Sequence, residues 1–471
     1  MSSDLRTEVF KNGFTTVLVG LALAVYALLI SGVTVSYVEA VSACTTWPTC
    51  DGSWMVNVSD TDVLIAMGHR LLSVIVGIGL VSATIWSWLN AVPRKVRLTL
   101  TGVVLIYPLQ VAVGALTAIH GGSTAISGIH LGIAIAIFMG TMVALLFWLE
   151  WETRAVQSEY VSSVRQEPTL DGDEDATSVA TSTPSLWAYV QLTKPRLMWL
   201  LCVVALAGIG LATVSSGVAI TWQMVTGTLV GGVLAIGASG TFNHVIERDV
   251  DQQMDRTARR PVPAGEVPPR RALLFGVGLA LSSMIVFISL VNLVATLLAL
   301  LAIVFYSIVY TVVLKPNTTQ NIVIGGAVGA LPALIGWAAV TGSIGVPALV
   351  LGAIVFLWTP AHFYNLALVY QRDYQAGGFP MLPIVHGEGV THRHIVLYLA
   401  ATLTAVGFLA ATVSLGWIFA VISVIFAGVF LTAVVNLYRR QTRPAALVTF
   451  HTSNIFLGMI MLVIILETIV F

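Results

Sequence analysis

The sequence predicts an all-α integral membrane protein in which a four-helix transmembrane bundle is followed by a nine-helix transmembrane bundle. The first observation is composition: 57% of the 471 residues are hydrophobic and 9% are charged, against roughly 25% charged in soluble domains. The second is that the apolar residues gather in stretches of about 20, which is the length of a membrane-spanning helix. This pattern excludes a soluble enzyme, a fibre and a disordered chain.

Thirteen apolar stretches have the length of a spanning helix, so the first is not expected to be a signal peptide. Four come early, at about 14–36, 62–90, 97–118 and 126–149. Nine come later, at about 197–216, 221–243, 272–290, 293–313, 321–341, 345–366, 395–413, 416–436 and 448–469. Between them lies a Ser/Thr-rich segment with an acidic run that cannot bury a core. We therefore divide the chain into a four-span module at 1–150, a disordered linker at 151–186 and a nine-span module at 187–471.

Lys and Arg predict the orientation in the membrane, because they concentrate in cytoplasmic loops. With the N-terminus placed inside, the basic residues of 248–271 and of the other charged loops all fall on the cytoplasmic side. The alternate loops, such as 37–61 and 119–125, contain no Lys or Arg. We expect a cell-membrane protein with a cytoplasmic N-terminus and linker and an external C-terminus. The net charge of zero gives no attraction for nucleic acid, which is not expected as a partner.

The loop after the sixth span contains a regular series of oxygen-bearing side chains. Four of them recur at every fourth position: Asn243, Glu247, Asp251 and Asp255. In a helix this spacing places their oxygens along one face, and such ligands suit Mg²⁺. Arg256, Arg259 and Arg260 follow, and guanidinium groups match phosphate oxygens. The alternative is a solvated loop whose charges merely pair with one another.

A second polar stretch follows the tenth span on the same predicted side. It contains His362, Arg372 and Asp373 among aromatic residues and prolines. A loop of this kind could close the first site like a lid. The alternative is an aromatic belt at the membrane interface with prolines that form turns.

Together these motifs resemble those of protohaem IX farnesyltransferases (haem O synthases), within the membrane-embedded prenyltransferase superfamily. The resemblance covers about 187–471 and includes the following stretches: Leu192-Thr-Lys194-Pro-Arg196, Asn243 to Pro261, Tyr310-Thr-x₃-Lys315, Asn321 to Trp337, Trp358-Thr-Pro-x-His362 and Asp373 to Pro383. It implies a nine-helix prenyltransferase bundle. The implied reaction joins farnesyl diphosphate, haem b and water to give haem O and pyrophosphate, for the haem A/O of terminal oxidases.

The resemblance also implies roles for individual residues. The implied catalytic residues are Asn243, Glu247, Asp251, Asp255, His362 and Asp373, with Asn243, Glu247 and Asp251 as Mg²⁺ ligands. The implied substrate-binding residues are Lys194, Arg196, Arg248, Arg256, Arg259, Tyr310, Lys315 and Arg372. Glu247 stands where the family is expected to carry Asp, and Glu can also bind a metal. His362 and Asp373 replace the second acid-rich motif of quinone-type relatives, which favours haem; a quinone-precursor prenyltransferase is the alternative.

In the first module, two histidines lie at equal predicted depth on neighbouring spans. His69 and His130 both fall roughly 8–10 Å below the outer surface, at 1.5 Å per residue. Two such imidazoles could bind one haem iron axially, whereas a lone intramembrane histidine is often a packed residue. Cys44 and Cys50 lie in the outer loop, where a disulfide can persist. Two free thiols are the alternative.

Residues 12–150 are similar to the N-terminal half of haem A synthase, through Cys44 to Gly52, His69-Arg70, Gln110 to Thr117 and His130. The resemblance implies that His69 and His130 bind haem b and that the module oxidises haem O to haem A or holds haem. Ala66 stands where the family carries Glu, and four spans replace eight, so a non-catalytic b-type cytochrome remains an alternative. The expected partners are farnesyl diphosphate, protohaem IX and membrane lipid. A second copy of the chain and terminal-oxidase assembly proteins stay open.

Overall fold

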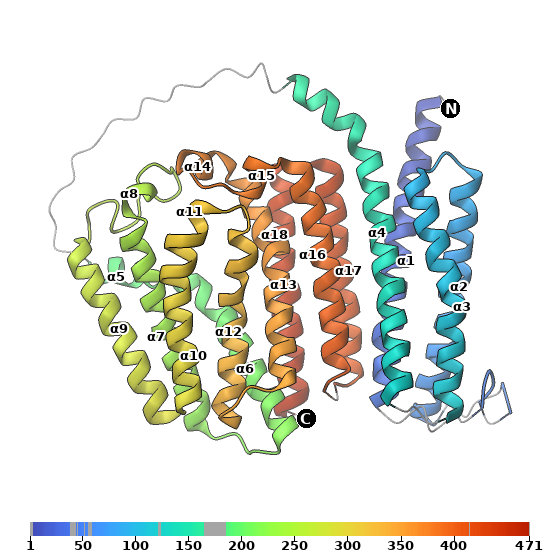
Figure 1. Cartoon of the computed structure of the whole chain (residues 1–471), viewed down its shortest axis with the longest axis horizontal. Coiled ribbons are helices and arrows are strands. Elements are labelled where there is room, and N and C mark those ends of the chain that lie inside the picture. The colour runs from blue at the N-terminus through green and yellow to red at the C-terminus, as the bar shows by residue number, and fades with distance from the viewer. Residues whose placement is uncertain are drawn as a thin grey trace. The chain divides into compact units, whose positions relative to one another are not determined.

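The computed structural model of the chain consists of helices and the loops between them (Figure 1). It describes residues 3–37, 44, 46–50, 52–54, 59–120, 124–163, 185–413 and 415–470. Within these ranges, thirteen helices are long and apolar enough to cross a membrane, which confirms the thirteen predicted spans. The protein is therefore an all-α, multi-pass membrane protein.

The helices form two compact units. The first comprises Met1–Val161 and Val396–Ala445, and the second comprises Ser162–Ile395 and Ala446–Phe471. These units reflect packing, whereas the module boundaries at 150 and 187 concern order along the chain and stay a prediction. The first part of the predicted linker is helical, because the fourth helix continues to Ser163. Residues 164–184 of that linker lie outside the described residues, and its last residue, Leu186, begins a helix.

The first unit contains five helices and part of a sixth: α1 (Ser3–Tyr37), α2 (Thr61–Leu89), α3 (Arg94–His120), α4 (Thr124–Ser163), the later part of α16 (Glu388–Ala410) and α17 (Trp417–Arg440). α2 begins after Asp60, whose carboxylate accepts hydrogen bonds from the backbone N–H groups of Asp62 and Val63 in the first turn. At the end of the unit where α1 begins, buried Glu152 of α4 pairs with Arg439 of α17 at 3.0 Å and accepts a hydrogen bond from Thr15 of α1. These contacts fix the three helix ends together.

The second unit contains the remaining helices. They are α5 (Leu186–Leu192), α6 (Pro195–Ser216), α7 (Trp222–Ile246), α8 (Arg248–Asp251), α9 (Pro269–Leu290), α10 (Leu293–Val304), the π-helix η2 (Phe305–Leu314), α11 (Lys315–Asn317), α12 (Asn321–Thr341), α13 (Val346–Val369), α14 (Gln371–Ala376), α15 (Leu382–Val385), the start of α16, α18 (Arg443–Ile465) and the π-helix η3 (Leu466–Val470). Figure 1 shows α8, α14 and α15 at one end of this unit, with the end of α18 at the other.

Small residues set the closest helix contact in the second unit, between α6 and α12. A Cβ added at Gly208 would overlap the backbone of Ala333, and one added at Gly336 would overlap the backbone of Ala205. Glycines at these two positions let the helix backbones touch, as is common where membrane helices cross.

Candidate functional site

Three of the four predicted oxygen-bearing residues share one helical face where α7 ends. We call Asn243, Glu247 and Asp251 the acid ladder. The backbone N–H of Glu247 donates to the carbonyl of Asn243 at 2.9 Å, and that of Asp251 donates to the carbonyl of Glu247 at 2.7 Å. All three side chains are buried. Asp255 lies in the turns after α8 and is exposed, so the structure does not bring this predicted catalytic residue into the ladder.

Two lysines from distant parts of the sequence reach the ladder. Lys194, just before α6, donates from Nζ to Oδ1 of Asn243 at 2.5 Å. Lys315, at the start of α11, donates from Nζ to Oε1 of Glu247 at 2.6 Å. A buried carboxylate is costly unless it is paired and hydrogen-bonded, so these contacts stabilise the charges at the end of the bundle. Both lysines are among the substrate-binding residues that the sequence predicted.

The last position of the ladder pairs with an arginine of the same loop. Arg260 donates to Oδ2 of Asp251 at 2.8 Å, and the side chain of Asp251 is fully buried. The other oxygen, Oδ1, is buried without a hydrogen-bond partner among the described residues. Of the three arginines considered as phosphate ligands, Arg260 is the one that contacts the ladder. Arg256 and Arg259 are exposed.

Lys194 occupies a strained backbone position. Its φ is 56°, in the left-handed region that side-chain-bearing residues rarely adopt. Gly240 of α7 makes this possible, because a Cβ there would lie 2.9 Å from the carbonyl oxygen of Leu192 and 3.3 Å from Cγ of Lys194. Burial lowers the pKa of the Lys194 amine to about 8, and the positive charge of Arg260 acts in the same direction. The fold thus keeps the Lys194 amine beside the ladder, in a place where burial disfavours its charged form.

The ladder also offers the donor atoms that Mg²⁺ prefers. It combines two carboxylates with an amide oxygen, and Oδ1 of Asp251 has no competing partner in the described part of the chain. No three Asp, Glu, His or Cys side chains gather as a complete metal cage within the described ranges. Mg²⁺ characteristically takes one or two carboxylates and completes its shell with water and substrate phosphates. The residues present therefore fit Mg²⁺ bound together with a phosphate-bearing substrate.

The two polar loops meet beside the ladder, as the lid hypothesis requires. The guanidinium of Arg256 lies over the ring of Tyr370 at 4.5 Å and over that of Tyr374 at 5.5 Å. A Cβ added at Gly377 would lie 3.1 Å from the sulfur of Met254. The Nζ of Lys315 lies 4.2 Å above the ring of Phe379. Cations of the first loop and of α11 therefore rest on aromatic rings of the second loop.

An aromatic pair stands at the membrane side of the ladder. Tyr306 and Tyr310 stack with ring centroids 5.6 Å apart on the π-helix η2, a helix type that often marks functional sites. The hydroxyl of Tyr306 lies 3.3 Å from Nζ of Lys194. Thr311 receives a hydrogen bond from the amide of Asn243 at 3.3 Å. Tyr310 was predicted to bind substrate, and Tyr306, one turn earlier, was missed.

An apolar cavity of about 130 Å³ begins at Lys194 and Tyr306 and extends into the bundle. Helices α6, α7, α10 and α12 form its walls, with residues such as Leu201, Ala235 and Pro332. The entrance of the cavity is therefore basic and its interior is apolar. This combination suits an amphiphile with an anionic head and a hydrocarbon tail.

Several other predicted residues are exposed or only half-buried. Arg196, Arg248 and Arg372 are exposed, and Arg248 pairs with Asp249. Asp373 is half-buried on α14.

His362 is buried between α13 and α18. Its Nδ1 lies 2.7 Å from the hydroxyl of Ser453, and its ring stacks on Trp358 and Phe450. His362 does not line the cavity. The structure therefore does not bring His362 together with the ladder.

The first unit holds a larger cavity, of about 380 Å³, which both predicted histidines line. Nδ1 of His69 lies 2.9 Å from the hydroxyl of Ser31, and Nε2 of His130 lies 3.3 Å from the amide nitrogen of Gln110. Gly114 leaves room for the second ring, because a Cβ there would lie 2.8 Å from Cε1 of His130. Ser31 and Gln110 were not expected, because partners on other helices leave no local signal in the sequence.

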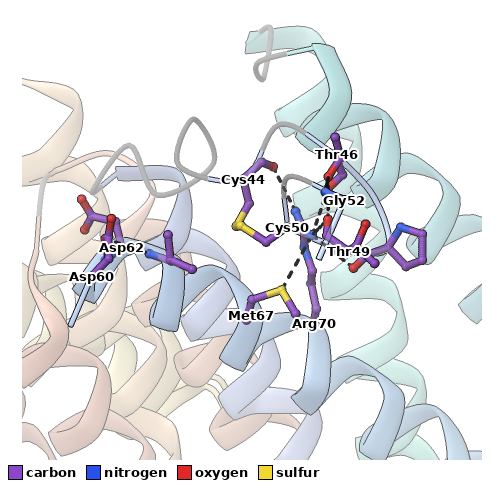
Figure 2. The surroundings of a disulfide bond; sticks show 11 residues. Cys44, Thr46, Thr49, Cys50, Gly52, Asp60, Asp62, Met67 and Arg70 are labelled. Atoms are coloured by element: carbon purple, nitrogen blue, oxygen red, sulfur yellow. Dashed lines mark hydrogen bonds between the residues drawn. A yellow bond between two sulfur atoms is a disulfide. The ribbon is translucent and has the colours of Figure 1, made fainter. Parts of the chain in front are cut away.

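The loop above this cavity is fixed by a disulfide and an arginine. Cys44 and Cys50 form a disulfide bond, as predicted. Figure 2 shows Arg70, the neighbour of His69, donating to the carbonyls of Cys44, Thr46 and Thr49 at 2.9–3.1 Å. Ala66 packs against the two cysteines and also lines the cavity.

The chain is similar to known proteins in both of its parts. Residues 201–460 match the UbiA prenyltransferase family, and residues 3–139 match COX15-CtaA, a family of cytochrome oxidase assembly proteins. A protoheme IX farnesyltransferase of Halobacterium salinarum is 47% identical over 473 residues, which covers all of both chains. One of Haloarcula marismortui is 48% identical over 96% of this chain and 98% of its own. A solved structure of digeranylgeranylglyceryl phosphate synthase covers 61% of this chain and 99% of its own, with a TM-score of 0.49 and 17% identity.

The family match spans more than half of the chain, and the full-length relatives share nearly half of its residues. The chain therefore belongs to the UbiA prenyltransferase family and is a transferase of prenyl groups.

Proposed function

We propose that the second unit transfers the farnesyl group of farnesyl diphosphate to a vinyl group of protohaem IX, giving haem O and pyrophosphate. The observation that carries the proposal is the junction at Lys194 and Tyr306. There a buried set of oxygens and cations meets the entrance of an apolar cavity. A prenyl diphosphate has the same division, with an anionic head and a hydrocarbon tail.

The acid ladder would hold Mg²⁺ through the side-chain oxygens of Asn243, Glu247 and Asp251. When bound, this ion supplies positive charge that stabilises the negative charge developing on the leaving diphosphate. The ladder's cations, Lys194 and Lys315, would then turn from the ladder oxygens to phosphate oxygens. A charge-assisted hydrogen bond to phosphate is roughly twice as strong as a neutral one.

In the proposed reaction, the bond between farnesyl C1 and the diphosphate oxygen breaks, and its electron pair leaves with pyrophosphate. The electrons of the haem vinyl group form the new bond to C1. Water adds to the adjoining vinyl carbon and loses a proton, which completes the hydroxyethyl group. The rings of Tyr306 and Tyr310 would stabilise positive charge on the allylic carbon through their faces.

Haem is preferred as the acceptor because two full-length relatives are named protoheme IX farnesyltransferases. The proposed orientation places the ladder on the cytoplasmic side, since the basic loops predict that side to be inside. For the first unit we propose that His69 and His130 bind haem within their shared cavity.

The proposal is tested with the purified full chain in lipid, supplied with Mg²⁺, farnesyl diphosphate and equal amounts of protohaem IX and a quinone precursor. Mass spectrometry should find haem O as the main product. A chelator and the Asp251→Asn variant should each abolish it. A prenylated quinone in place of haem O would overturn the acceptor, and transfer that survives both treatments would overturn the role of the ladder.

A further inference from the structure

The apolar cavity of the second unit has a definite depth, set along α7. The residues of α7 that line it are Thr228, Leu229, Gly232, Ala235, Ile236, Ser239 and Gly240. They follow the spacing of one helical face. Gly240 stands at the entrance beside Lys194, and Thr228 stands twelve positions deeper. At 1.5 Å per residue, that is a depth of about 18 Å.

The lower end of the cavity lies at the level where α6 and α12 touch. Ala205 of α6, Thr228 of α7 and Ile335 of α12 are the deepest lining residues of their helices. A Cβ at Gly336 would overlap the backbone of Ala205, and one at Gly208 would overlap the backbone of Ala333. On the other side of α7, a Cβ at Gly227 would lie 2.8–2.9 Å from side chains of Leu290 and Val291. The helices are therefore closely packed around this end of the cavity.

The depth of the cavity is sufficient for three isoprene units. A farnesyl group has a main chain of twelve carbons, which extends over about 14 Å at carbon–carbon bonds of roughly 1.5 Å. A geranyl group extends over about 9 Å and a geranylgeranyl group over about 19 Å on the same basis. A farnesyl tail therefore extends past the middle of the cavity and ends about 4 Å above Thr228. A geranyl tail leaves the lower half empty, and a geranylgeranyl tail would reach Thr228.

Gly232 lies about two thirds of the way down, eight positions from Gly240. A Cβ added there would meet no heavy atom within 4 Å, so the wall is open at this level. Cys202 of α6 lies eight positions after Lys194, at the same depth, and also lines the cavity. Both residues lie beyond the reach of a geranyl tail and within the reach of a farnesyl tail.

We infer that the missing side chain at Gly232 is what admits the third isoprene unit of the prenyl chain. The inference rests on the proposed function, because it places the prenyl tail in this cavity. Any larger side chain at Gly232 would fill the lower part of the cavity and leave the acid ladder unchanged. A leucine there should convert a farnesyl site into a geranyl site.

The test compares geranyl, farnesyl and geranylgeranyl diphosphates with the full chain and its Gly232→Leu variant. The ratio of kcat/KM for farnesyl to that for geranyl should fall about tenfold or more in the variant, the effect expected from overfilling a packed site. The matched control is Gly278→Leu on α9, where an added Cβ also meets nothing but faces away from the cavity. An unchanged ratio would overturn the inference.

A second measurement needs no acceptor. Cys44 and Cys50 are joined in a disulfide, so Cys202 is the free thiol of the three cysteines. Non-transferable thiolodiphosphate analogues are added before alkylation with a membrane-permeant maleimide. The farnesyl analogue should slow labelling of Cys202, and the geranyl analogue should not. Equal protection by both would refute the depth assignment. Protection by farnesyl without haem O formation would instead place the fault in the proposed acceptor.

Discussion

The amine of Lys194 lies 2.5 Å from the amide oxygen of Asn243, although the two residues are 49 positions apart. This contact joins the segment before α6 to the last turn of α7. It is made from a left-handed backbone conformation, which costs roughly 1–2 kcal/mol for a residue with a side chain. A strained residue beside a buried polar cluster is expected at a functional site.

Replacing Lys194 by Met should lower kcat/KM for prenyl transfer about 10- to 100-fold. The reason is the loss of a hydrogen bond to a charged group, which contributes roughly 1.5–3 kcal/mol. Lys194→Arg should recover part of the activity, because the charge remains. Arg271→Met, at an exposed position of α9, serves as the control and should behave like the unaltered chain. Activity within twofold of normal in Lys194→Met would contradict the role of this amine.

Gly240→Ala should displace Lys194 without removing its charge. The added Cβ would lie 2.9 Å from the carbonyl oxygen of Leu192, so the segment before α6 must move. We expect a loss of activity similar to that of Lys194→Met and a destabilisation of about 1–3 kcal/mol. Kinetics and thermal unfolding of the detergent-solubilised chain measure the two effects. Gly278→Ala, whose Cβ meets nothing, is the matched control, and a normal Gly240→Ala enzyme would show that the close contact is unimportant.

The histidine cavity of the first unit should give a bis-histidine haem spectrum. Replacing either His69 or His130 by Ala removes one of the two lining imidazoles, and low-spin haem should disappear from the reduced-minus-oxidised spectrum. His120→Ala, at the exposed end of α3, should leave the spectrum intact. Haem O formation should survive in all three variants, because the acid ladder lies in the second unit. A normal low-spin spectrum in both variants would exclude these ligands.

Ala66→Glu should raise the ratio of haem A to haem O. Ala66 lines the same cavity as His69, one helical turn away, and stands where the resembling family carries a carboxylate. Ala66→Gln has nearly the same volume without the charge, so it separates chemistry from packing. Extracted haem is quantified by chromatography and mass spectrometry. Equal ratios in the Glu and Gln variants would show that a carboxylate at this position does not promote oxidation.

The spans were predictable because each apolar stretch is long enough to cross a bilayer by itself. The ladder was predictable because Asn243, Glu247 and Asp251 repeat with the period of a helix that continues through the loop. Asp255 lies outside the ladder because the chain leaves the helix after α8, a turn that the neighbouring residues do not indicate. The surroundings of His362 were not predictable because they include α18, which is far away in the sequence.

Contacts between distant helices were the least predictable part of the site. Three examples are the pairing of Lys315 with Glu247, the packing of Lys194 on Gly240 and the backbone contact at Gly208. All three depend on which helices become neighbours. Periodicity within one segment carries no information about them. The same limit applies to Ser31 and Gln110, which hold the histidines from other helices.

The central claim is that the acid ladder promotes farnesyl transfer to haem. Its most direct test is mass spectrometry of haem extracted from cells that lack their own haem O and haem A synthases. These cells would express the full chain or its Glu247→Gln/Asp251→Asn variant at equal membrane levels. Haem O from the full chain and only haem b from the variant is the predicted result. Haem b alone from both, or haem O from both, would contradict it.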